Sequence, residues 1–168
     1  MKKSIKKIYE ISAPIEQVWR ALVDPKIIDE WGGGPSTMDG KIGTEFQLWG
    51  GDIHWKNIEV VKEKKLLQEW FGGDWPNPSI VKFTLQTENN KTILELEHTS
   101  VPDEDVDDIE QGWDEYYLGP IKEMLDKTWS SYICSGIKIC RIIFIKYEYT
   151  DFSQSLRFRF NKKRENWQ

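Results

Sequence analysis

The histidines His54 and His98 are the side chains whose charge changes near neutral pH, so proton transfer is the first chemistry to consider. His98 ends the alternating run Thr92–Thr99 on the parity of Leu94 and Leu96, and we expect it to face the interior of a sheet. We interpret it as a hydrogen-bonded interior histidine, with a catalytic role as the alternative. His54 follows a turn, and we expect it to be exposed.

Carboxylates are numerous, but their placement is typical of solvated surfaces. Glu95 and Glu97 share the outward parity of one strand, and the acidic run Asp103–Glu110 suits the first turns of a helix. A catalytic carboxylate needs a desolvated site that shifts its pKa. Glu69 is the alternative candidate for an inward-facing acid, because the apolar residues two positions on either side share its parity.

The sequence contains no recognisable motif for binding a metal ion or a nucleotide, or for nucleophilic catalysis. Cys134 and Cys140 lack companions at the spacing of a zinc site. The run Gly32-Gly33-Gly34-Pro35 lacks the lysine and the following helix of a phosphate-binding loop. We therefore predict no catalytic residue, no metal and no cofactor, and we expect a binding protein in preference to an enzyme.

Charge is divided unevenly along the chain. Residues 1–126 carry 14 Lys and Arg against 25 Asp and Glu, a net of −11, while residues 127–168 carry 9 against 3, a net of +6. An acidic body argues against a nucleic-acid partner, because phosphate binding needs clustered cations. The chain contains no run of 18 apolar residues, so no membrane span is predicted. Nothing in it resembles a signal peptide, and we therefore expect a cytoplasmic protein.

The elements that must position these side chains begin with a strand and two short helices. Ser4–Ser12 alternates as a strand does, and Pro14 then suits the first turn of a helix with an apolar stripe from Ile15 to Leu22. A second short helix is expected over Lys26–Trp31, closed by the glycine run that follows it.

Short alternating runs joined by tight turns then predict an antiparallel meander with one buried face. The expected strands are Thr44–Trp49, Ile53–Glu63, Leu66–Phe71, Ser79–Thr87 and Thr92–Thr99. A long amphipathic helix follows, with apolar residues four apart at Ile109, Trp113, Tyr117, Ile121 and Leu125. Gly119-Pro120 is expected to bend that helix.

The predicted fold class is therefore α+β. It is a curved antiparallel sheet of about six strands wrapped on a long C-terminal helix, with two short helices after the first strand.

Three segments carry a resemblance: Ser12–Leu22, Asp24-Pro25 followed by Ile28–Trp31, and Gly112–Leu118. In this order they resemble the START-like (Bet v 1-like, SRPBCC, helix-grip) superfamily. More narrowly, they resemble the domain at the C-terminal end of the Hsp90 ATPase activators and in many small stand-alone proteins. The resemblance covers residues 1–126, so we predict one domain there. Residues 127–168 form a C-terminal extension of unknown role, interpreted as an added strand and tail, a partner-binding extension or a poorly specified end.

The resemblance implies a cavity between the sheet and the long helix that binds a hydrophobic or amphipathic small molecule. The predicted cavity-lining residues are Trp31, Phe46, Trp55, Trp70, Phe83, Leu96, His98, Trp113 and Tyr117. Non-enzymatic ligand binding is our first hypothesis. The alternatives are a protein-interaction or co-chaperone-like module with a chaperone partner, and a cyclase- or hydrolase-like enzyme using His98 or Glu69.

Overall fold

The computed structural model describes residues 4–72 and 75–134. Their elements are β1 (Ile5–Ile11), α1 (Ile15–Val23), α2 (Pro25–Trp31), β2 (Glu45–Leu48), η1 (Trp49–Gly51), β3 (Ile53–Val61), β4 (Lys65–Gly72), β5 (Ser79–Glu88), β6 (Lys91–Thr99), α3 (Val106–Gly112), η2 (Trp113–Tyr117) and α4 (Leu118–Cys134). The predictions for the extension beyond Cys134 lie outside the described residues.

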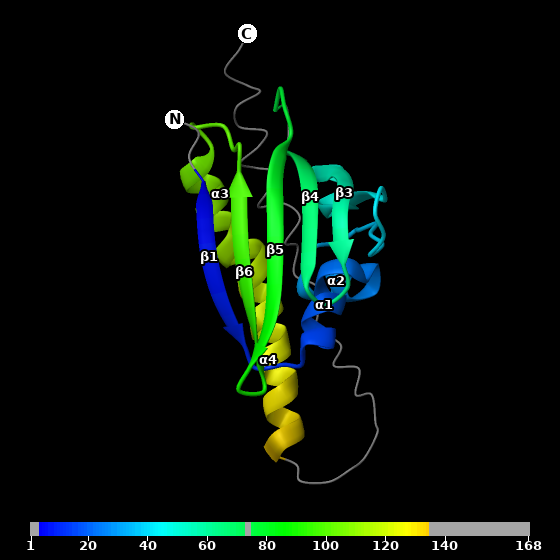
Figure 1. The fold of residues 1–168 in the computed structure, drawn as a ribbon, viewed down its shortest axis with the longest axis vertical. Helices are drawn as coiled ribbons and strands as arrows, with labels where there is room; N and C mark the ends of the chain where they lie inside the picture. Colours follow the sequence, from blue (N-terminus) through cyan, green and yellow to red (C-terminus); the bar gives the residue numbers. More distant parts are fainter. Residues whose placement is uncertain (1–3, 73–74, 135–168) are drawn as a thin grey trace.

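The six strands form one antiparallel sheet in the order β1-β6-β5-β4-β3-β2, so β1 and β2 are its edges. The helices cover one face of this sheet, and α4 runs diagonally behind it (Figure 1). The α+β fold class, with two short helices after the first strand and a long C-terminal helix, is confirmed.

The sheet buries one face because its strands alternate. In β5, Val81, Phe83 and Leu85 point inward and are buried, while the residues between them are partly exposed. The same alternation runs through β4 and β6. Buried side chains of α1 and of η2–α4 close the core from the other side, so the structure has two layers around one hydrophobic interior.

The two short helices begin and end where the sequence signals lie. Pro14 is extended and precedes α1, and Asp24 separates the helices. The Asp24 carboxylate accepts a hydrogen bond of 3.1 Å from the backbone N–H of Lys26, which caps α2. Gly32 ends α2 with a φ of +102°, a conformation that favours glycine.

The long helix has an irregular turn just before Gly119-Pro120. The turn before them is π-helical, a feature that the sequence did not predict, and the backbone N–H of Leu118 reaches the carbonyl of Trp113. The predicted bend stays a prediction. Pro120 has no N–H to donate and its ring displaces the preceding turn. Gly119 is required there, because a Cβ at that position would lie 1.8 Å from the carbonyl oxygen of Asp114. The wider turn also separates α3 from α4.

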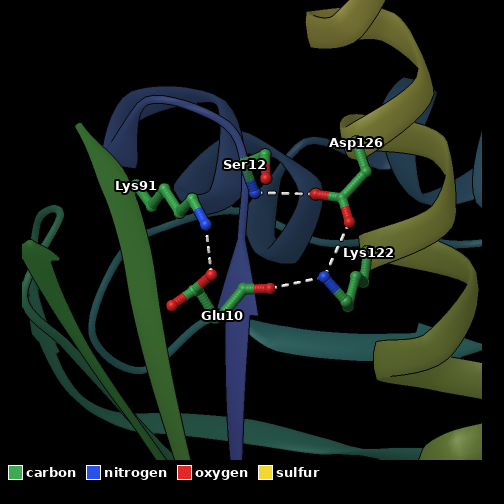
Figure 2. A network of polar contacts seen from close by, with 5 residues as sticks. All are labelled: Glu10, Ser12, Lys91, Lys122 and Asp126. Carbon is green, nitrogen blue, oxygen red and sulfur yellow. Dashed lines mark hydrogen bonds and ion pairs between the residues drawn. The ribbon is translucent and has the colours of Figure 1, made fainter. Parts of the chain in front are cut away.

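Polar contacts fasten α4 to the C-terminal end of β1 (Figure 2). The backbone N–H of Ser12 donates to the Asp126 carboxylate at 2.7 Å, and the Lys122 ammonium donates to the backbone carbonyl of Glu10 at 2.5 Å. Lys122 and Asp126 also pair with each other at 2.6 Å. Because the two residues are four apart, they share one face of the helix and can both reach the strand.

Candidate functional site

Aromatic rings fill the space between the sheet and the long helix. Tyr117 of η2 lies at their centre, 4.8 Å from Trp31 of α2 and 4.9 Å from Trp113 between ring centroids. Trp70 of β4 lies 5.0 Å from Trp113, and Phe83 of β5 stacks on Tyr117 at 5.9 Å. These five side chains, called the aromatic core below, come from four elements and are all buried. Such separations are those of rings in direct contact.

Eight of the nine residues predicted to line a cavity therefore face the interior and are buried: Trp31, Phe46, Trp70, Phe83, Leu96, His98, Trp113 and Tyr117. They pack against one another, with Phe46 and Trp70 at 6.2 Å between ring centroids. Their role in binding a ligand stays a prediction.

Trp55 is the exception, because its side chain lies on the outer face and is 39% exposed. Its register places it opposite the inward-facing Trp70, but its φ of +146° departs from ordinary strand geometry. The indole N–H instead donates to the Glu69 carboxylate at 3.0 Å, and the ring meets Phe71 edge-on at 5.0 Å. The interior position opposite Trp70 is already filled by Phe46.

His98 is held by a closed chain of hydrogen bonds inside the core. The indole N–H of Trp113 donates to Nδ1 at 3.2 Å, which leaves the proton on Nε2. Nε2 lies 2.8 Å from the Ser79 hydroxyl, which in turn donates to the carbonyl of Trp70 at 3.2 Å. Burial lowers the pKa of His98 to about 3, so the ring is neutral at ordinary pH. This arrangement orients the imidazole and satisfies both of its nitrogens.

The hydroxyl of Tyr117 is the one buried side-chain polar atom in the described ranges that has no hydrogen-bond partner. Burial raises the pKa of this phenol, so it stays protonated. A buried polar group without a partner is uncommon in native structures and calls for a physical reason.

A second buried polar chain was not predicted from the sequence. The Gln68 amide donates to the Asn57 side-chain oxygen at 2.7 Å and accepts from the indole N–H of Trp70 at 2.9 Å. The Asn57 amide donates to the backbone carbonyls of Asp39 and Lys41, and so fastens the loop before β2 to the sheet. The signal was present, because Gln68 shares the inward parity of Leu66 and Trp70.

Glu69, the alternative candidate for an interior acid, lies on the outer face. It shares its parity with the apolar side chains of β4 that point away from the helix, among them Phe71. Its carboxylate is 3.8 Å from the Lys56 ammonium and accepts from Trp55. No desolvated acid is thus placed near His98 among residues 4–72 and 75–134.

Three of the exposed large apolar side chains belong to β3. Trp55, Ile58 and Val61 are 39%, 37% and 42% exposed. Phe71 of the neighbouring strand lies beside Trp55, with 5.0 Å between the ring centroids. His54 was expected to be exposed but is partly buried, and its ring stacks on Phe71 at 6.0 Å between centroids. Trp55, Ile58, Val61 and Phe71 are called the β3 stripe below.

Two hollows stand out, and neither lies in the aromatic core. The larger, about 270 Å³, adjoins the β3 stripe and is lined by Thr37, Glu45, Phe46, Gln47, His54 and Trp55. The smaller, about 180 Å³, lies between α1 and α4 and is lined by Ala13, Gln17, Leu125, Thr128 and Trp129.

The described part of the chain carries neither a metal-binding cluster nor a membrane-spanning helix. No group of three or more His, Cys, Asp or Glu side chains there is arranged to hold a metal ion. No helix there is long and apolar enough to cross a membrane.

Comparisons with known proteins add a family. The family profile described as "Activator of Hsp90 ATPase homolog 1-like protein" matches residues 12–126. The human activator of 90 kDa heat shock protein ATPase homolog 1 is 24% identical over 110 residues, which are 64% of this chain and 32% of that protein. The chain thus spans about a third of the length of the curated relatives it matches.

Two solved structures share the fold. The protein MLL2253 from Mesorhizobium loti has a TM-score of 0.66 and 26% identity, over 75% of this chain and 98% of that one. The HSP90 activator PFC0360w from Plasmodium falciparum has a TM-score of 0.67 and 23% identity, over 73% of this chain and 95% of that one. At 23% identity, the likeness to the Plasmodium falciparum protein concerns the fold alone.

Proposed function

Because the chain belongs to the Activator of Hsp90 ATPase homolog 1-like family, we propose that it binds an Hsp90-type chaperone and acts as a co-chaperone through the β3 stripe. The human relative is named as an activator of a 90 kDa heat shock protein ATPase, and a yeast relative, 26% identical over 119 residues, as an Hsp90 co-chaperone. A cytoplasmic location, where we expect such a partner, belongs to the same proposal.

The β3 stripe is the observation that carries this proposal. A tryptophan, an isoleucine and a valine of one strand are each more than a third exposed, and an aromatic side chain of the next strand adjoins the tryptophan. Tryptophan is enriched among the residues that dominate binding energy at protein interfaces. The hydrogen bond from Trp55 to Glu69 fixes the orientation of the indole, so little side-chain entropy is lost when a partner covers it.

The backbone at Trp55 supports the same reading. A non-glycine residue with a φ of +146° inside a strand costs on the order of 1–3 kcal/mol, and such residues cluster at functional sites. The strained backbone places the indole on the outer face, where solvent and a partner can reach it.

Catalysis is not part of the proposal. His98 is neutral, satisfied on both ring nitrogens and surrounded by aromatic side chains. Glu69 lies on the opposite face of the sheet from it. A general acid or base must reach the proton that it transfers, and neither group has a partner placed for that role.

An ATPase assay tests the proposal. We expect the purified full-length chain to raise Hsp90 turnover with saturation, and Trp55→Ala to raise the half-saturating concentration about 30-fold, equivalent to about 2 kcal/mol. Ile93→Ala is the matched control, because Ile93 is a partly exposed apolar residue on the outer face of β6. A chain that neither binds Hsp90 nor changes its turnover refutes the proposal. Equal effects of the two substitutions refute the β3 stripe as the contact surface.

Binding of a small apolar molecule in the interior is the second candidate, and the hydroxyl of Tyr117 favours it. A ligand with one polar atom would give that hydroxyl the partner that it lacks. Native mass spectrometry of the freshly purified chain tests this candidate. An added mass that leaves on denaturation supports it, and the bare mass of the chain counts against it.

A further inference from the structure

The free edge of the sheet at β1 has an unusual composition. Ile8 is 72% exposed, the highest fraction among the large apolar residues described. On the same outward parity lie Lys6 and Glu10, with side chains 68% and 59% exposed. An exposed edge strand is a template on which another strand can pair.

The contacts of α4 identify which backbone groups of β1 point away from β6. The carbonyl of Glu10 accepts from Lys122, so Glu10 directs its backbone groups toward the open side (Figure 2). Residues of an antiparallel strand alternate in this respect. Lys6 and Ile8 share the parity of Glu10 and therefore also direct their N–H and C=O groups to the open side, where no described residue is seen to bond them.

We propose that β1 pairs with β1 of a second copy of this chain, antiparallel and centred on Ile8. In this register Ile8 lies opposite Ile8 of the second copy, and Lys6 lies opposite its Glu10. The twofold axis repeats the charge pair, so one strand supplies both halves of the contact, as an isologous interface requires. A register moved by two residues sets Ile8 opposite a charged residue, so the sequence selects this one.

Charges on the outer face of the sheet already alternate toward this edge. Lys82 of β5 pairs with Glu97 of β6, and Glu97 pairs with Lys6 at 3.1 Å. The three residues lie in one cross-strand row. The row runs positive, negative, positive and ends at the edge. Glu10 of the second copy continues it with a negative charge, and opposite charges directly across strands stabilise a sheet.

The contacts of α4 set the length of the pairing. Asp126 takes the N–H of Ser12, so the free edge ends there. Lys122 uses only one of the two lone pairs on the Glu10 carbonyl, and the other remains for the N–H of Lys6 of the second copy. The diagonal course of α4 behind the sheet keeps it from lying along the edge over its whole length (Figure 1). A contact made by one pair of strands buries little surface, so we expect a weak dimer whose fraction rises with protein concentration.

Sedimentation equilibrium over a range of protein concentrations tests this proposal, with the charges of Lys6 and Glu10 reversed singly and together. We expect a monomer–dimer equilibrium, whose Kd rises at least tenfold in Lys6→Glu and in Glu10→Lys, because each sets like charges opposite each other. The double variant K6E/E10K restores opposite charges, and its Kd should return to within about threefold of the parent. Glu88→Lys, at the exposed end of β5, is the control for the change in net charge.

Circular dichroism confirms that each variant is folded, and Ile8→Lys, which sets two lysines at the centre of the contact, gives a second probe. A chain that is monomeric at every concentration overturns the proposal. A dimer whose Kd ignores the single substitutions also overturns it, because another surface then forms the dimer. Since no Hsp90 is present in these experiments, their outcome does not depend on the proposed function.

Discussion

Replacing Tyr117 by phenylalanine removes one oxygen from the centre of the aromatic core and leaves the ring contacts with Trp31, Phe83 and Trp113 in place. The hydroxyl is buried and has no partner, and such a group costs about 1–3 kcal/mol of desolvation. We expect Tyr117→Phe to raise the free energy of unfolding by about 1 kcal/mol, at the low end of that range, because the core can relax around the oxygen. The corresponding rise in Tm is about 2–4 °C.

Urea denaturation followed by tryptophan fluorescence measures this effect. The midpoint should rise while the m-value stays constant, which attributes the change to stability. Tyr9→Phe is the matched control, because the Tyr9 hydroxyl donates to the Asp114 carboxylate. Removing that hydrogen bond should lower the free energy of unfolding by about 1 kcal/mol, since the site is partly exposed.

The opposite result for Tyr117→Phe would refute this reasoning. A loss of 1 kcal/mol or more means that the hydroxyl has a partner in solution, such as a water molecule or a ligand. The interior would then hold more than the side chains described, and the second candidate function would gain support.

Two further predictions follow from the core. The pKa of His98 is lowered to about 3 in the folded chain from an ordinary 6.5, so the unfolded chain binds an extra proton between these pH values. The contribution of His98 to stability should be full above pH 6.5 and fall toward pH 3 by at most about 1.4 kcal/mol per pH unit. Urea titrations of the parent and of His98→Gln at several pH values check this, because the substitution should make the pH dependence shallower by that amount. Gly119→Ala should destabilise by several kcal/mol or prevent folding, because its Cβ meets the carbonyl of Asp114 at 1.8 Å. Gly112→Ala, where the nearest atom is a flexible side chain at 3.9 Å, should be neutral or stabilising, and thermal melts of both variants compare the two outcomes.

Much of the fold follows from local patterns. The two-residue period of Ser79–Thr87 and Thr92–Thr99 identifies both the strands and their buried faces. Asp24-Pro25 and Gly32 mark the two ends of α2, because their backbone preferences do not depend on distant residues. Tyr117 and Trp113 belong to the inward stripe of the long helix on spacing alone.

Other features depend on tertiary contacts that the pattern does not contain. Inward parity is the same for rings that line a cavity and rings that fill one, so the packing of Trp31 against Tyr117 could not be inferred. Trp55 has inward parity in the sequence, but its φ of +146° and the hydrogen bond to Glu69 place it outside. The π-helical turn before Pro120 contains Asp114, which pairs with Lys7, a residue more than 100 positions away in the chain.

Hydrogen–deuterium exchange of the full-length chain, with and without Hsp90, tests the central claim most directly. The account predicts that Hsp90 slows exchange in β3 and β4, around Trp55 and Phe71, while exchange in β6 changes little. Trp55→Ala should abolish that protection and leave the exchange of the free chain in β5 and β6 as in the parent. Protection confined to other elements, or none at saturating Hsp90, would contradict the assignment of the β3 stripe as the surface through which this protein acts.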